Sequence, residues 1–454
     1  MSHNNTSLNT LDKTHFLHPF TDFKEYKATD TAIYTKAEHI YIYNEAGKEL
    51  IDGMSGLWCC NLGYSQPKIN EAISNQLNSL PFYNSFFQCT TDVTVKMAKA
   101  LVDISPAQFN HVFFTNSGSE ANDTNIRLVH RYYDLLGKPS KKIFISRHGA
   151  YHGSTIAAGS LGGFSGMHKQ YTGLSYVEHI GQPNWFTEGG DMDKAEFGIK
   201  VAQELAAKID EVGEENVAAF IAEPIQGAGG VIVPPETYWP EISRICKERD
   251  ILLISDEVIC GFGRTGDWFG AQTFGFEPDL MTFAKAVTNG YQPLGGVLVS
   301  DKVADVLSAD GGEFTHGFTY SGHPAACAAG IATIDILKND KVIENAVADI
   351  MPYFQAQLRT LESHPIVGEV RGMGMVAALE IAKNNSAKER LAPDCAGGAM
   401  VKTHAINHGL MVRSVGDAIV TAPPMVCNRE EIDLLITRLT IALDYTAKHY
   451  GIKT

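Results

Sequence analysis

The chain has 454 residues, of which 44% are hydrophobic and 20% are charged, a composition typical of globular proteins rather than of disordered or fibrous ones. Its 37 Lys and Arg against 52 Asp and Glu give a formal net charge of −15. Such a field repels phosphate backbones and anionic membranes, so the charge argues against nucleic acid and membrane surfaces as partners.

The cysteines and the N-terminal residues bear on the cellular compartment of the protein. The eight cysteines form no C-x-x-C pair, which predicts free thiols and no zinc or thioredoxin-like motif. The first residues are polar and lack the basic and apolar regions of a signal peptide. No run of about 18 apolar residues is present to span a bilayer. Together these features predict a cytoplasmic protein.

Short apolar runs rich in β-branched and aromatic residues alternate with segments of helical period, which predicts βαβ units. These runs cover residues 111–115, 142–146, 217–222 and 251–255. Parallel strands need crossover helices on both faces of their sheet. The sequence therefore predicts an α/β fold, with a large doubly wound domain over residues 60–325 built on a mainly parallel sheet.

Two of the connecting helices have clear apolar faces. The first has Ile126, Val129, Tyr133 and Leu136 on one side and is expected to end at Gly137. The second stacks Val201, Leu205, Ile209 and Val212 and is expected to end at Gly213.

The last helix begins with a predicted capping box at Asn428 and Glu431. Its inward side chains are Ile432, Leu435, Ile436, Leu439 and Leu443. We expect a smaller α+β domain made of residues 1–59 and 326–454, packed on the large one.

Ligands of open parallel sheets bind beyond the carboxyl ends of the strands, so we examined the polar residues there. The segment 115–121 joins a strand to a helix, where serine hydroxyls and free N–H groups could bind a phosphate. Taken alone, Ser117 and Glu120 are more simply read as a capping box.

Asp256 and Lys285 close two further apolar runs. A buried ion pair seldom adds stability over apolar packing, so chemistry explains this pair better. A lysine in apolar surroundings loses its proton more easily, and the free amine forms a Schiff base with an aldehyde. The pair therefore predicts a phosphorylated aldehyde cofactor.

Glu223 precedes a glycine-rich loop, 227–230, that either lets the backbone approach a ligand or forms a plain turn. Tyr151 offers an aromatic ring that could lie on a pyridine. His148 and His152 have the spacing of a metal pair, but glycines interrupt that segment and no Glu follows His148, so we predict no metal there.

The segment 261–266 matches G-x-G-x-x-G, as in a dinucleotide-binding enzyme. Five residues separate Ser255 from its first glycine, and the residues after its last glycine continue poorly as a helix. We therefore expect an irregular loop at the mouth of the site.

The segments LISDEVICGFGRTG (253–266) and FAKA (283–286) resemble the signature of class III aminotransferases. Further segments resemble the amine:pyruvate, or omega-transaminase, branch: 54–58, 116–121, 151–153, 222–227 and 316–324. The resemblance covers nearly the whole chain. It implies pyridoxal phosphate (PLP), the aspartate-aminotransferase architecture called fold-type I, and a homodimer, or pairs of such dimers, with sites at the subunit interface.

The resemblance also implies roles for single residues. Lys285 would bind the cofactor covalently and later move the proton, while Asp256 would pair with the pyridine nitrogen and keep it protonated, so that the ring accepts electrons. The implied cofactor-binding residues are Ser117, Gly118, Ser119, Tyr151, His152, Glu223, Val258 and, from the other subunit, Thr319.

The resemblance further implies two half-reactions, in which an amine leaves its nitrogen on the cofactor and pyruvate collects it as alanine, with ping-pong kinetics. Arg413 would bind the acceptor's carboxylate. The side chains expected to border the amine are Phe20, Leu57, Trp58, Phe86, Tyr151 and Ala228. Among relatives with these motifs, putrescine:pyruvate enzymes are the most similar, followed by users of β-alanine, taurine and aryl-alkyl amines.

Two other functions remain open at this stage. A lysine and an aspartate also serve PLP-dependent aminomutases and decarboxylases. A PLP-binding scaffold protein without catalysis could share the fold, because fold alone does not define function.

Overall fold

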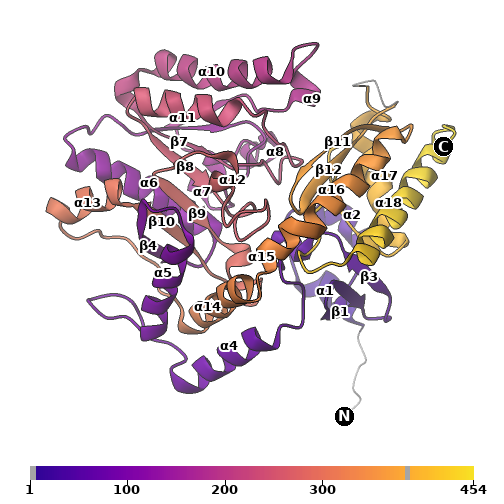
Figure 1. Ribbon diagram of the computed structural model, residues 1–454, viewed down its shortest axis with the longest axis horizontal. Coiled ribbons are helices and arrows are strands. Elements are labelled where there is room, and N and C mark those ends of the chain that lie inside the picture. The colour runs from indigo at the N-terminus through magenta and orange to yellow at the C-terminus, as the bar shows by residue number, and fades with distance from the viewer. Residues whose placement is uncertain (1–6, 384–388) are drawn as a thin grey trace.

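A seven-stranded sheet forms the centre of the protein, whose computed structural model describes residues 7–383 and 389–454 (Figure 1). Its strand order is β4-β10-β9-β8-β7-β5-β6. The strands are β4 (Phe109–Thr115), β5 (Ile143–Arg147), β6 (Val177–Ile180), β7 (Val217–Ala222), β8 (Leu252–Asp256), β9 (Leu280–Phe283) and β10 (Gly295–Ser300).

From β9 to β6 all neighbouring strands are parallel. Strand β10 runs antiparallel to both β9 and β4. No crossover helix separates β9 from β10, and a short connection can join only antiparallel neighbours. The predicted mainly parallel α/β sheet is confirmed, whereas β6 and β10 were not predicted.

Helices cover both faces of this sheet. Side chains along β7 alternate between two cores: Phe220 and Ala222 belong to one, and Ala219 and Ile221 to the other. Helices α5 (Asp92–Ile104), α10 (Lys194–Val212) and α11 (Tyr238–Glu248) contribute to the first core. Helices α6 (Gly118–Leu135) and α13 (Asp301–Asp310) contribute to the second.

The predicted helix faces are confirmed except at their ends. In α6, Ile126, Val129 and Tyr133 are buried, but Leu136 is 42% exposed. That part of the prediction is wrong because α6 ends at Leu135 and Leu136 lies in the terminal turn. In α10, Gly213 ends the helix with φ of 88°.

A second region lies beside the large sheet, with helices α16–α18 next to strands β11 and β12 (Figure 1). One of its sheets has the order β11-β12-β15-β14, and another has the order β1-β2-β3-β13. Its strands are β1 (Tyr34–Glu38), β2 (Tyr41–Asn44), β3 (Glu49–Asp52), β11 (Val367–Met373), β12 (Val376–Ile381), β13 (Leu410–Met411), β14 (Arg413–Val415) and β15 (Ala418–Thr421).

The remaining helices complete the chain. They are α1 (Leu8–His15), α2 (Phe23–Ala28), α3 (Ser55–Trp58), α4 (Pro67–Ser79), α7 (Ile156–Leu161), α8 (Ser165–His168), α9 (Trp185–Glu188), α12 (Gly270–Phe274), α14 (Pro324–Asn339), α15 (Val342–Asn345), α16 (Met351–Arg359), α17 (Ala396–Asn407) and α18 (Arg429–His449). The capping box predicted for α18 is present, because Asn428 and Glu431 cap each other.

Pairing between β3 and β13 joins the N-terminal part of the chain to its C-terminal part. The domain limits at residues 59 and 325 stay a prediction, and residues 1–6 lie outside the described residues. Helix α14, which begins at Pro324, packs on both α4 and α5.

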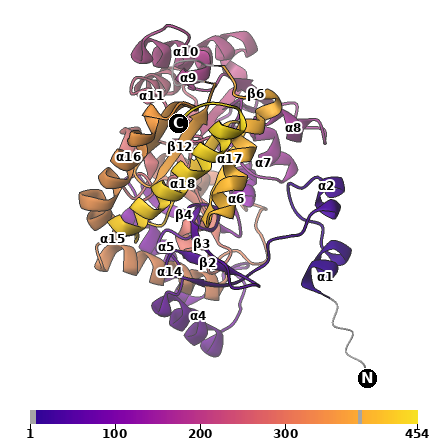
Figure 2. The ribbon, with the colours of Figure 1, turned by 90° about the vertical axis from the view of Figure 1, so that its right-hand side faces the viewer.

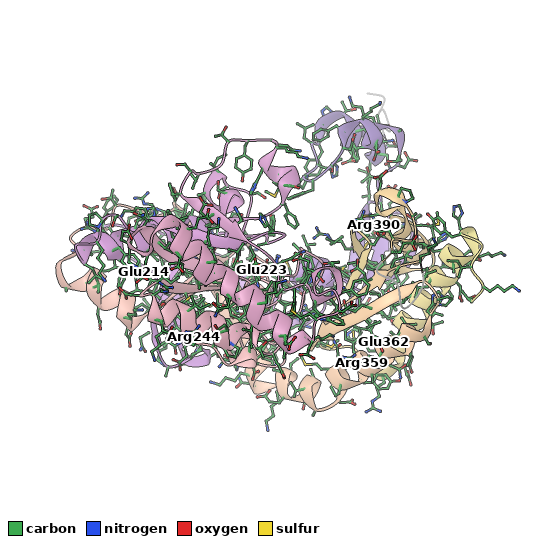
Figure 3. All side chains as sticks on the ribbon, turned by 90° about the horizontal axis from the view of Figure 1, so that it is seen from above. Glu214, Glu223, Arg244, Arg359, Glu362 and Arg390 are labelled. Atoms are coloured by element: carbon green, nitrogen blue, oxygen red, sulfur yellow. The ribbon has the colours of Figure 1, made fainter. Side chains whose placement is uncertain are left out.

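Helices α1 and α2 stand apart from the rest of the chain and bury none of their side chains (Figure 2). Among the helices that the structure describes, none has both the length and the apolar composition needed to cross a membrane. Seen from above, Glu223 lies near the middle of the molecule, between the parts that carry Arg244 and Arg359 (Figure 3).

Candidate active site

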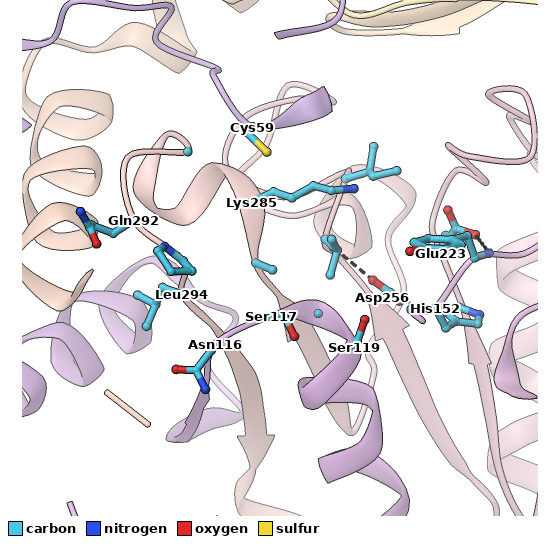
Figure 4. A pocket seen from close by; sticks show the side chains of 18 residues that line it. Cys59, Asn116, Ser117, Ser119, His152, Glu223, Asp256, Lys285, Gln292 and Leu294 are labelled. Carbon is cyan, nitrogen blue, oxygen red and sulfur yellow. Dashed lines mark hydrogen bonds and ion pairs between the residues drawn. The ribbon is translucent and has the colours of Figure 1, made fainter. Parts of the chain in front are cut away.

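A cavity of about 450 Å³ opens at the carboxyl ends of the parallel strands, where ligands of such sheets bind. Nine of the predicted site residues line it: Ser117, Gly118, Ser119, Tyr151, His152, Glu223, Asp256, Val258 and Lys285. The side chain of Lys285 reaches across the space, with Ser117 and Ser119 below it (Figure 4).

Lys285 begins a short 3-10 turn, Lys285–Thr288, just after β9. Its φ is 51°, a left-handed conformation that is uncommon for a residue with a side chain. Burial lowers the pKa of its ammonium, against the opposing influence of Cys59, Asp256 and Glu223. Lys285 is therefore more readily the free amine that attacks an aldehyde.

Asp256 is the last residue of β8 and is only 3% exposed. Its Oδ2 receives hydrogen bonds from Asn122 Nδ2 at 2.9 Å and His152 Nδ1 at 2.8 Å. Its Oδ1 accepts from the backbone N–H of Val258 at 3.2 Å. These donors fix a carboxylate at the floor of the cavity.

The start of α6 forms a further wall of the cavity. Ser117 caps the helix by accepting the Glu120 N–H at 3.2 Å. Glu120 accepts the N–H of Asn116, not that of Ser117, so the reciprocal capping box is not formed. The first N–H groups of a helix lack partners within it, and Gly118 and Ser119 at the start of α6 line the cavity.

Glu223 links two backbone segments. Its oxygens accept the N–H groups of Tyr151 at 3.2 Å and Gly227 at 2.9 Å, and burial raises its pKa. Nearby, His152 is 2% exposed, and among the described residues its Nε2 has no partner. His148 turns elsewhere and stacks on His179 at 5.6 Å.

Two loops that the sequence analysis singled out are held by contacts within the protein. In the glycine-rich loop, a Cβ on Gly227 would lie 2.4 Å from Ile259, and one on Gly229 would lie 2.5 Å from a backbone oxygen of Gly149. These glycines permit close packing within the protein, as a plain turn requires. The approach of this loop to a ligand stays a prediction.

The G-x-G-x-x-G loop is irregular, as predicted, but it does not line the cavity, so its predicted place at the mouth of the site is wrong. Its Arg264 is fully buried and donates to the carbonyl groups of Met375, Ala422 and Pro423. These hydrogen bonds hold the loop between the large sheet and the C-terminal region.

Two basic side chains lie near one aromatic ring. Trp58 is buried, with Lys285 Nζ 5.1 Å and Arg413 Cζ 5.6 Å from its ring centroid. Burial lowers the pKa of Arg413, and no described carboxylate forms an ion pair with it. Arg413 and Leu57 line an adjoining cavity of about 730 Å³.

The other predicted substrate residues, and Thr319 predicted for the cofactor, do not line the cavity of Lys285 in a single chain. Phe20 is 75% exposed, with its ring 6.2 Å from Tyr151. Ala228 is buried in the glycine-rich loop. Phe86 lines a separate pocket near Gly317, and Thr319 is exposed.

Sequence reasoning missed several polar residues at the site, Gln292 among them. Cys59 lines the cavity, Asn122 contacts Asp256, and the buried Glu257 follows Asp256 in the chain. One signal was available for Asn122: a carboxamide three residues before another, Asn125, on the apolar face of a predicted helix.

The residues present fit PLP. Lys285 offers an amine for the aldehyde, and Asp256 offers an acceptor for a protonated ring nitrogen. A helix N-terminus with two serines suits the phosphate. The cradle is also shaped for a flat ring: a Cβ on Gly118 would come within 2.9 Å of Val258, so only glycine leaves this wall open.

Sheet order and cavity are those of a fold-type I PLP-dependent transferase. The chain belongs to the aminotransferase class-III family, whose model matches residues 24–443, and it is a PLP-dependent transaminase.

Individual relatives of this chain also carry the names of transaminases. The chain is 52% identical to a putrescine–pyruvate aminotransferase from Pseudomonas aeruginosa, over 96% of both chains. It is 43% identical to a gamma aminobutyrate transaminase from Solanum lycopersicum, over 95% of this chain and 85% of the relative. The omega transaminase from Pseudomonas jessenii in complex with PMP superposes with a TM-score of 0.95 at 39% identity, covering 99% of this chain and 100% of that one.

Proposed function

We propose that this transaminase moves an amino group from a primary diamine such as putrescine to pyruvate, giving an amino aldehyde and alanine. The observation that carries the proposal is the meeting of Lys285, Asp256 and the start of α6 in one cavity, in a chain 52% identical to a putrescine–pyruvate aminotransferase. The formal net charge of −15 favours the approach of a cationic amine.

Lys285 carries the proton. When bound, PLP supplies an electron sink that stabilises the charge left on the substrate carbon. The Lys285 amine, with its lowered pKa, would take the proton from that carbon and deliver it to the cofactor carbon that carried the aldehyde oxygen. Asp256 pairs with the protonated ring nitrogen and, with its own donors, keeps that charge in place.

The remaining cofactor contacts bind and orient. Ser117, Gly118 and Ser119 hold the phosphate at the start of α6, where the helix dipole favours an anion. Tyr151 and Val258, which line the same cavity, would pack against the cofactor's ring. Glu223 and His152 hold the ring's hydroxyl side.

Arg413 binds the carboxylate of pyruvate, because a planar guanidinium offers two parallel donors to it. Trp58 places that guanidinium near Lys285. The amine's carbon chain lies along Trp58, Leu57, Phe20 and Tyr151, with Ala228 behind them. The apolar side chains would therefore border the amine donor, and the Arg413 guanidinium would bind the acceptor.

A homodimer completes the site in this proposal. Thr319 and Phe86 lie away from the cavity of their own chain, and a second copy would bring them to it. Thr319 would then close the phosphate site from the partner. The enzyme would work in the cytoplasm, where the eight free cysteines stay reduced.

An amine panel tests the proposal. Purified holoenzyme is assayed for alanine formed from pyruvate with putrescine, γ-aminobutyrate, β-alanine, taurine and an aryl-alkyl amine, with Lys285→Ala as control. We expect putrescine to exceed γ-aminobutyrate by at least about tenfold in kcat/KM. Preference for another donor overturns the assignment of the amine, and carbon dioxide release or isomerisation without pyruvate overturns transfer itself.

A further inference from the structure

Helix α6 carries two buried asparagines on the face that packs on the central sheet. Asn122 and Asn125 are both 0% exposed, and a spacing of three residues places them on one side of the helix. Ile126 and Val129 are buried in the same helix. A buried carboxamide needs hydrogen-bond partners, because an unpaired one is costly.

Thr282 and Asn125 together orient the amide of Asn122. Its oxygen accepts the hydroxyl of Thr282 at 2.8 Å and Nδ2 of Asn125 at 3.0 Å. The same Nδ2 also donates to Thr282 Oγ1 at 2.7 Å. Thr282 is the residue of β9 that pairs with Asp256 of β8. With its oxygen held from this side, the amide presents its NH2 group to Asp256.

That NH2 group donates to Asp256 Oδ2 at 2.9 Å and to the backbone oxygen of His152 at 2.7 Å. Because His152 Nδ1 contacts the same carboxylate oxygen at 2.8 Å, Oδ2 meets two side chains. Within the described part of the chain, Oδ1 meets only the longer backbone contact from Val258. Asn122 thus ties Asp256 and the His152 segment together through a single group.

We infer that Asn122 is a positioning residue, whose carboxamide fixes the Asp256 carboxylate in the orientation that pairs with the cofactor's ring nitrogen. This inference rests on the role proposed for Asp256. A hydrogen bond to a charged group is about twice as strong as one between neutral groups. Losing it frees the carboxylate to turn and weakens its hold on the protonated ring.

Asn122→Leu removes the amide but keeps the branched shape and the number of side-chain heavy atoms, and Thr282→Val replaces only the orienting hydroxyl by a methyl group. The control is Asn184→Ala, at another buried asparagine, which caps the short helix α9. We expect Asn122→Leu to raise the Kd for PLP about tenfold and to lower kcat by a similar factor, with both KM values within about twofold. Thr282→Val should give a smaller change in the same direction.

Cofactor affinity by equilibrium dialysis and a pH titration of the bound cofactor's absorbance provide readouts besides activity. The pH midpoint of this titration should rise in Asn122→Leu. A ring nitrogen that holds its proton less firmly makes the ring a weaker electron acceptor, so the nitrogen that Lys285 supplies keeps its own proton to a higher pH. A merely structural role would lower thermal stability and leave this midpoint in place.

The outcomes separate this inference from the proposed function. Wild-type protein that neither binds PLP nor forms alanine overturns the proposed function. Wild-type activity together with an unchanged Kd and midpoint in Asn122→Leu overturns the inference alone, as does an equal change in Asn184→Ala. If Asn122→Leu fails to fold, Thr282→Val decides by the same two readouts.

Discussion

Single residues at the cavity meet strict local constraints. Lys285 adopts a left-handed backbone conformation, which turns its side chain out of the line of β9 and into the cavity. Gly118 lies where any Cβ would press on Val258. Such constraints fix the position of reacting groups at a cost in local stability.

Gly118→Ala should loosen the cofactor. The added methyl group would lie 2.9 Å from Val258 Cγ2, so Val258 must shift into the space for the ring. We expect the Kd for PLP to rise about tenfold, a change of ~1.4 kcal/mol, measured by equilibrium dialysis.

Val258→Ala supplies the control, because it removes the contacted methyl group. In a double-mutant cycle the second change should recover part of the affinity lost by Gly118→Ala. Strictly additive losses would contradict a direct contact between these two positions.

Part of the site could be predicted from the sequence. Asp256 and Lys285 are conspicuous because a charged residue closing an apolar run is rare unless chemistry requires it. Asn122 was not conspicuous, because an asparagine inside a helix is ordinarily exposed. Its role depends on Asp256 and Thr282, which lie more than a hundred residues away along the chain.

At the scale of elements, the loop after β8 is anchored by a buried carboxyl group. Glu257 accepts the N–H groups of Gly270 at 2.7 Å and Ala271 at 2.8 Å, and the Ser255 hydroxyl at 2.8 Å. Burial nevertheless raises its pKa to about 7. The loop thus spans from the residue beside Asp256 to the start of α12.

This raised pKa predicts the sign of a pH dependence. Between about pH 4.5 and pH 7 the folded protein holds the proton more tightly than the unfolded chain, so stability falls as pH rises. Relative to Glu257→Gln, the wild type should lose about 2 to 3 kcal/mol in free energy of unfolding between pH 5 and pH 8. Denaturant titration at both pH values measures this difference.

Glu236→Gln, at an exposed position, serves as the matched control and should show little pH-dependent difference from wild type. A difference between wild type and Glu257→Gln that stays constant, or grows in favour of wild type with rising pH, would contradict the assigned burial.

Arg371 joins two elements. From β11 it donates to the backbone oxygens of Gly230 and Val231 in the glycine-rich loop. It also bonds Glu369 and Glu380 at 2.8 Å each. It therefore connects the C-terminal region to the loop that follows Glu223.

Arg371→Met should destabilise the protein by about 3 to 5 kcal/mol, because it leaves two mostly buried carboxylates without their partner. Chemical denaturation measures the loss. Adding Glu369→Gln and Glu380→Gln should recover part of it, whereas a loss below about 1 kcal/mol in Arg371→Met would show that the connection is dispensable.

At the scale of the whole molecule, the helical period of apolar residues and the β-branched and aromatic composition of the short runs predicted the mainly parallel α/β sheet. They missed β10, because Gly295 and Gly296 begin a strand that pairing with β4 and β9 stabilises. They also misplaced the 261–266 loop, since its burial depends on contacts with Met375 and Pro423. Tertiary contacts of this kind leave no local pattern.

We predict that a second copy of the chain contacts exposed aromatic side chains, those of Phe82, Tyr83, Phe87 and Tyr320. Phe87 is 90% exposed, and the rings of Phe82 and Tyr320 lie 5.5 Å apart. Phe87→Asp should raise the dimer dissociation constant at least about tenfold, measured by sedimentation. Specific activity should fall with dilution.

Leu136→Asp places the same charge on an exposed leucine at the end of α6 and should leave the association unchanged. A fully dimeric Phe87→Asp protein, with wild-type activity at every dilution, would contradict this interface.

The central claim is that Lys285 is the residue that binds the cofactor covalently. Borohydride reduction of the PLP-loaded protein, followed by peptide mapping, tests it directly. We predict a pyridoxyl label on the peptide that contains Lys285 and no stable label in Lys285→Ala. A label on another lysine, or none in the loaded wild type, would contradict the account.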